Sequence, residues 1–171
     1  MTSNQATKAQ SELEMVRQFT QTPGQPLVKL IRNLGLSYDE VTMPAGQSGE
    51  IRYDNGRYKI LINASESDAR KRFTAAHELA HYLYHRDMLD DVGSLNRHSD
   101  WLFDTRENDA RPFSPQHETE ANRIAGQILM PAALVRAEYE NTGGDVEELA
   151  NIFDVSKAAM EIRLKVLKLG T

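Results

Sequence analysis

Residues 77–81 form an HExxH motif, the feature of this sequence that carries the most chemistry. On an α-helix, positions i and i+4 lie on the same face, so His77 and His81 can both reach one metal ion. Glu78 would stand beside that ion, where its carboxylate can accept a proton from a bound water. This is the chemistry of a zinc-dependent peptidase. With the histidine and glutamate content of this chain, such a pattern arises by chance about once in a hundred sequences.

The residues around the motif favour a helix. Residues 67–86 contain neither glycine nor proline, and Ser67 or Asp68 is a suitable N-cap. Apolar side chains recur at spacings of three and four residues, at Phe73, Ala76, Ala80 and Leu83. The sequence therefore predicts that His77 and His81 lie one turn apart on a helix. Two unrelated surface histidines are the alternative interpretation.

Length and composition limit the class of protein. The chain has 171 residues, the size of one ordinary domain, and no cysteine. A metal would therefore bind nitrogen and oxygen ligands, which favours Zn²⁺, with Mn²⁺ as an alternative. The net charge is -5, and no apolar run approaches the length of a signal or membrane segment. We expect a cytoplasmic, soluble protein that is not bound to a membrane and does not coat nucleic acid.

We expect a polar N-terminal arm at residues 1–24, which could be mobile, and a single domain at residues 25–171. Within the domain, residues 51–53 and 58–62 have the composition of two strands, joined by a tight turn at residues 54–56. A small antiparallel sheet thus precedes the HExxH helix. An edge of this sheet could pair with an extended substrate backbone, or the hairpin could be purely structural.

Residues 86–116 are polar, and we expect a long loop there. The loop follows the HExxH helix directly and contains His98 and the single tryptophan, Trp101. A loop in this position could form a lid or a wall of the substrate site. For the side chains of His98 and Trp101 we favour a surface role.

Two histidines leave a hydrolytic zinc site one protein ligand short, because such sites use three protein ligands and a water. The residues considered for the third position are His85, His98, His117, Glu118 and Glu120. His85 extends the same helix face by another turn, about 6 Å beyond His81, so it cannot easily share a tetrahedral ion with the other two histidines. We expect it to support the core or the cleft.

Glu118 is the preferred third ligand. It begins a predicted helix, residues 118–130, whose apolar side chains can pack on the HExxH helix. Asn122 lies one turn further on, where its amide can accept a hydrogen bond from the other ring N–H of a ligand histidine. Glu120 points about 200° away from Glu118 around the helix, so the two should not bind the same ion; it remains the alternative. Glu118 could also be a solvated glutamate that interacts only with the helix dipole.

Three ordered strings, RFTAAHELAH at 72–81, ETEANRIA at 118–125 and ILMP at 128–131, resemble the ImmA/IrrE family of HExxH metallopeptidases. The resemblance runs from about Val28 to Leu169. It implies a small zincin-like α+β fold, in which a short antiparallel sheet packs on the HExxH helix and a helical portion follows at about 145–170. It also implies that His77, His81 and Glu118 are the zinc ligands. In the same resemblance, Glu78 is the catalytic base.

The function implied by the resemblance is a zinc-dependent endopeptidase that hydrolyses a specific regulatory protein. The expected substrate is a helix-turn-helix repressor or an antitoxin-like partner. The alternative is a non-catalytic zincin-scaffold binding module, or the toxin component of a toxin-antitoxin pair, that sequesters a regulator. The N-terminal segment is too short for the helix-turn-helix domain of some relatives.

The C-terminal tail superficially resembles a helix-turn-helix at residues 149–164. Its last helix is locally basic, through Lys157, Arg163, Lys165 and Lys168. Relatives carry a similar tail beside the peptidase core. We therefore expect this tail to pack on the core or dock a partner, and we do not expect direct nucleic-acid binding.

Overall fold

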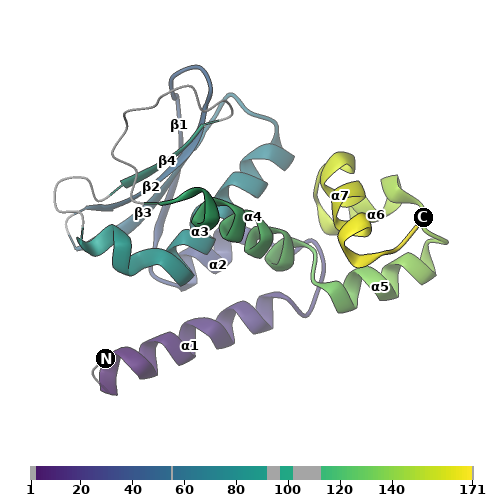
Figure 1. Cartoon of the computed structure of the whole chain (residues 1–171), viewed down its shortest axis with the longest axis horizontal. Coiled ribbons are helices and arrows are strands. Elements are labelled where there is room, and N and C mark those ends of the chain that lie inside the picture. Colours follow the sequence, from purple (N-terminus) through teal and green to yellow (C-terminus); the bar gives the residue numbers. More distant parts are fainter. Residues whose placement is uncertain (1–2, 55, 92–96, 102–112, 171) are drawn as a thin grey trace.

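A computed structural model describes residues 3–54, 56–91, 97–101 and 113–170 of the chain. Helices cover one face of a sheet, and the last three helices form a group beside it (Figure 1). Within the described ranges the elements are α1 Ser3–Phe19, α2 Leu27–Asn33, β1 Ser37–Val41, β2 Gln47–Asp54, β3 Arg57–Asn63, α3 Asp68–Asp91, β4 Arg97–Trp101, α4 Pro115–Leu129, α5 Ala132–Asn141, α6 Val146–Phe153 and α7 Lys157–Leu167.

The four strands form one sheet in the order β1-β3-β2-β4. Strands β2 and β3 are the predicted hairpin, paired antiparallel from Gly49 with Ile62 to Asp54 with Arg57. Strand β4 adds to β2 antiparallel, whereas β1 lies parallel to β3. The expected α+β class is confirmed, but the sheet is mixed and not purely antiparallel. Because both hairpin strands have neighbours on each side, neither has a free edge for a substrate.

Helix α3 carries the HExxH motif and packs against the sheet on one side and α4 on the other. The small, buried side chains of Ala75, Ala76 and Ala80 allow these elements to approach closely. The approach is close at Gly49 of β2, where an added Cβ would lie 2.4 Å from Thr74 Cγ2. The motif therefore sits on the most enclosed part of the helix, between the sheet and α4.

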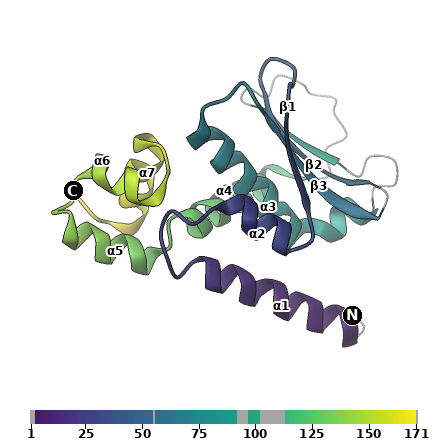
Figure 2. The same ribbon diagram turned by 180° about the vertical axis from the view of Figure 1, so that it is seen from behind.

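The N-terminal segment, expected as a polar arm, forms helix α1, which runs beneath α2 (Figure 2). Glu12 on this helix is 2% exposed. Its carboxylate accepts a hydrogen bond from the Tyr82 hydroxyl at 2.6 Å and from Arg86 Nη2 at 2.7 Å. The segment is a packed helix and not only a polar arm because the Glu12 ion pair with Arg86 of α3 adds to the contacts of its weak apolar stripe. The composition of the segment does not reveal this long-range ion pair.

The stretch expected as a long loop contains regular structure. Helix α3 continues to Asp91, β4 spans Arg97–Trp101, and α4 begins at Pro115. The backbones of His98 and Trp101 pair with Ile51 and Gln47 of β2. Strand β4 is polar and forms through backbone pairing with β2, so no apolar alternation marked it in the sequence. The side chains of His98 and Trp101, and residues 92–96 and 102–112, lie outside the described residues, so the lid stays a prediction.

The C-terminal helices α5, α6 and α7 are connected to the rest of the domain by polar contacts. Arg163 Nε of α7 donates to the Met130 carbonyl at 2.9 Å, and Arg72 Nε of α3 lies 3.5 Å from Asp154 Oδ2. Asp145 caps α6, because its side chain accepts hydrogen bonds from two backbone N–H groups of the first turn. None of the described helices combines the length and apolar character that a membrane span needs.

Candidate metal centre

His77, Glu78 and His81 lie in the middle of α3 and are almost completely buried. His77 is 3% exposed, and Glu78 and His81 are 0% exposed. Because four residues make slightly more than one helical turn, the two imidazoles project to the same side of α3. Their Nε2 atoms are 3.0 Å apart. The structure thus brings the two histidines together as the spacing predicts.

Helix α4 brings Glu118 to this pair. The helix begins with Pro115 at its first position, after Ser114, whose side chain accepts a hydrogen bond from the His117 backbone N–H. Glu118 is therefore in the first turn of α4, facing α3, with 29% of its side chain exposed. The helix docks through one apolar face, made of Ala121, Ile124, Ala125, Ile128 and Leu129.

Three metal-binding atoms converge between the two helices. Glu118 Oε2 lies 3.2 Å from His77 Nε2 and 3.6 Å from His81 Nε2. A tetrahedral zinc ion with bonds of about 2.0–2.2 Å needs ligand atoms roughly 3.3–3.6 Å apart. The three side chains form the one His, Asp and Glu group in the described part of the chain whose ligand atoms all lie within 4.8 Å of each other. With the 3.0 Å between the two Nε2 atoms, the donor triangle is within about 0.3 Å of the size that zinc requires.

Hydrogen bonds on the far side of each ring determine which nitrogen carries the proton. His77 Nδ1 donates to Asn122 Oδ1 at 3.0 Å, the contact predicted for Asn122. His81 Nδ1 lies 3.1 Å from His85 Nδ1, and His85 Nε2 lies 3.3 Å from Glu120 Oε2. Because a carboxylate only accepts, neutral His85 carries its proton on Nε2 and accepts through Nδ1 the proton of His81.

Both candidate ligands therefore present an Nε2 lone pair toward Glu118. Two lone pairs 3.0 Å apart repel each other, and a cation between them removes the repulsion. Burial lowers the pKa of His81 to about 4, although the nearby Glu118 carboxylate acts in the opposite direction. Phe113 stacks on the His81 ring with 4.0 Å between the centroids. The donor set consists of two buried imidazole nitrogens and one carboxylate oxygen, which fits a divalent cation.

Glu78 follows His77 directly on α3 and has no exposed surface. Both of its carboxylate oxygens are shielded from solvent. In a dry environment beside a metal site, a carboxylate is suited to accept a proton from water and to pass it on. The arrangement can therefore support general-base chemistry as well as metal binding.

The structure places two predicted residues in roles that sequence reasoning missed. Glu120, the alternative ligand, points away from Glu118 and contacts His85 and Arg123 instead. His85 is buried, as expected of a residue that supports the core, but it also contacts His81. The signal in the sequence was the spacing of four residues between His81 and His85, which places them one turn apart. His117 contributes to the start of α4 and is not part of the donor triangle.

Comparisons with known proteins agree with this geometry. The model of a peptidase family described as the IrrE N-terminal-like domain matches residues 40–165. The radiation response metalloprotease IrrE of Deinococcus deserti is 37% identical over 117 residues, which are 67% of this chain and 38% of that protein. The chain therefore spans well under half of this relative.

Among solved structures, a Mycobacterium tuberculosis transcriptional regulator has a similar fold, with a TM-score of 0.60 and 20% identity. The match covers 90% of this chain and 46% of the regulator. At this level of identity the likeness concerns the fold alone. The family match, in contrast, includes the HExxH helix and the helix that carries Glu118. The chain belongs to the ImmA/IrrE family of metallopeptidases, in the part described as the IrrE N-terminal-like domain.

Proposed function

We propose that this chain is a zinc-dependent endopeptidase with His77, His81 and Glu118 as the metal ligands and Glu78 as the catalytic base. The observation that carries the proposal is the donor triangle, whose edges measure 3.0, 3.2 and 3.6 Å, next to a fully buried carboxylate. The family match and the metalloprotease relative support the same reaction class.

When bound, zinc would supply Lewis-acid polarisation of the scissile carbonyl and lower the pKa of a water from about 15.7 toward about 7. The chain's own residues supply the rest of the chemistry. Asn122 and His85 orient the two imidazoles so that each Nε2 faces Glu118. The Glu78 carboxylate accepts the proton of the attacking water and transfers it to the leaving amine nitrogen.

The substrate in this proposal is a specific regulatory protein, a helix-turn-helix repressor or an antitoxin-like partner. The support is the family resemblance, together with a relative that is named a radiation response metalloprotease. A rival function, a zincin scaffold that binds a regulator without cutting it, makes a different prediction for the Glu78→Gln variant.

The test uses Glu78→Gln to capture a partner from cell extract, after which the captured protein is incubated with the parent chain. We expect the parent to bind about one zinc ion per chain and to cut the partner. Glu78→Gln should retain zinc and cut about 10²–10⁴-fold more slowly, because the general base is lost. Glu147→Gln, the same change at an exposed position on α6, is the matched control. Equal cleavage by Glu78→Gln and the parent would rule out the assigned base, and a biological effect that survives in Glu78→Gln would favour the binding module.

A further inference from the structure

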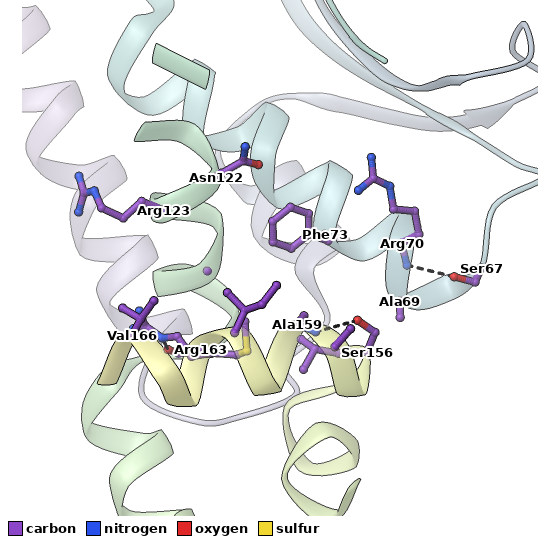
Figure 3. Close-up of a pocket in the computed structure, with 15 residues that line it drawn as sticks. Ser67, Ala69, Arg70, Phe73, Asn122, Arg123, Ser156, Ala159, Arg163 and Val166 are labelled. Carbon is purple, nitrogen blue, oxygen red and sulfur yellow. Dashed lines mark hydrogen bonds between the residues drawn. The ribbon is translucent and has the colours of Figure 1, made fainter. Parts of the chain in front are cut away.

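A groove of about 660 Å³ opens between α3, α4 and α7 (Figure 3). This interhelix groove has a mainly apolar lining that includes Phe73, Met130, Ile162 and Val166. Ile162 and Val166 lie one turn apart on α7 and are 63% and 64% exposed. Two adjacent aliphatic side chains with this much exposure, beside an apolar hollow, indicate a surface that is covered by a partner.

The charges of the interhelix groove are all positive. Three arginines line it and no acidic residue does, although the whole chain has a net charge of -5. Arg70 and Arg123 are each paired with a glutamate that is not part of the lining. Arg163 forms no ion pair with any residue in the described ranges; its Nε donates only to the Met130 carbonyl.

Arg163 is the chemical feature that defines the occupant. It is 8% exposed, and burial lowers the pKa of its guanidinium. A guanidinium in an apolar wall pays a desolvation penalty that a carboxylate partner offsets, and the planar group can hold a carboxylate through two parallel hydrogen bonds. The groove is therefore complementary to apolar side chains that flank an aspartate or glutamate.

The interhelix groove adjoins the candidate metal centre at Asn122. Asn122 lines the groove and also accepts the hydrogen bond from His77. Figure 3 shows Asn122 near Phe73, with Arg163 and Val166 on the α7 side. A chain segment seated in the groove would therefore be held beside the candidate metal ligands.

We propose that the interhelix groove binds an amphipathic helical segment of the protein substrate, with its apolar side chains in the groove and a carboxylate on Arg163. The inference rests on the proposed function, because the occupant is the substrate of the peptidase. A helical segment suits the site because Ile162 and Val166 lie one turn apart along α7, at the edge of the groove. Apolar side chains spaced one turn apart on a partner helix can pack against such a row.

The first test fills the groove without disturbing the fold. At Gly126 of α4, an added Cβ would meet no heavy atom within 4 Å. Gly126→Phe therefore projects a ring into open space, and Gly126→Ala is the matched control. The probe is a fluorescein-labelled amphipathic peptide of about 14 residues, or four helical turns, with leucines on one face and flanking glutamates. We expect it to bind the parent and Gly126→Ala alike and to bind Gly126→Phe at least about tenfold more weakly.

The second test examines charge and does not depend on filling the groove. Ile162→Glu places a carboxylate at the groove and should weaken peptide binding at least about tenfold. Leu13→Glu is the control, because Leu13 is also an exposed aliphatic residue, 50% exposed on α1, but does not line the groove. The same peptide with lysines in place of glutamates should bind the parent much more weakly. Melting temperature and zinc content should match the parent in both variants.

Peptide binding needs neither zinc nor Glu78, so it is measured on the metal-free protein and separates this inference from the proposed function. On a cleaved protein substrate, Gly126→Phe should raise KM and leave kcat unchanged. Equal peptide affinity for Gly126→Phe and Gly126→Ala, or equal binding of the lysine peptide, would overturn the inference while leaving the peptidase intact. If the parent binds dodecanoate but not the peptide, the groove is assigned to a lipid. If the parent is a dimer that Gly126→Phe dissociates, the groove is assigned to a second copy of the chain. Either result would also overturn the inference.

Discussion

Replacement of His85 by alanine should weaken zinc binding although no ligand is changed. His85 Nδ1 accepts the proton of His81 Nδ1 at 3.1 Å in a site where His81 has no exposed surface. In the His85→Ala variant, the Nδ1–H of His81 has lost its acceptor, and the His81 ring can turn away from the orientation that binds zinc. Loss of such a contact behind a metal ligand lowers metal affinity about 10–100-fold, which corresponds to ~1.4–2.8 kcal/mol.

The assay is a competition for zinc between the protein and a chelating dye, combined with thermal unfolding of the metal-free protein. His85→Gln should restore most of the affinity, because a side-chain amide oxygen can accept from His81 Nδ1. Glu120→Gln should change affinity only a few-fold, since its amide oxygen can still accept from His85 Nε2, at present 3.3 Å from the carboxylate. A role confined to packing predicts a lower melting temperature with no change in zinc affinity, so the two readouts separate positioning from packing. If His85→Ala binds zinc as tightly as the parent, the assignment of the His81 tautomer is wrong.

Three further predictions follow from other contacts. Glu118→Gln should remove stoichiometric zinc, measured as metal content, while the metal-free melting temperature stays near that of the parent. Burial raises the pKa of Glu12, but hydrogen bonds from Arg86 and Tyr82 and the charge of Arg86 outweigh it and hold the pKa below 4.5. The Glu12 contribution to stability is therefore full above about pH 4.5 and lost as pH falls through the lowered pKa. Glu12→Gln should cost about 2 kcal/mol at pH 7, and the difference should shrink in acid; a constant difference across urea titrations at several pH values would contradict this. Gly49→Ala should cost about 1–3 kcal/mol, since its Cβ would lie 2.4 Å from the Thr74 methyl, and Thr74→Ser should rescue it; the absence of rescue in urea unfolding would refute the clash.

Local patterns in the sequence were sufficient for several parts of the molecule. The hairpin of β2 and β3, the HExxH helix and α4 all follow from spacing, turn residues and apolar periodicity over a few consecutive residues. The pairing of His77 and His81 follows from helix geometry alone, because residues four apart on a helix are neighbours whatever surrounds them. For the same reason, Asn122 could be placed one turn from Glu118.

Other features depend on contacts between residues far apart in the chain. Strand β1 pairs with β3, and Glu12 reaches Tyr82 and Arg86. The proximity of Glu118 to the two imidazoles requires α4 to dock on α3, and the interhelix groove requires α7 to lie beside both. The amino-acid sequence by itself determined which side chains could do chemistry and which short segments would be helical or extended. The tertiary structure decided which of them meet, because burial, close packing and long-range pairing are settled over the whole chain at once and leave no periodic signal in any short segment.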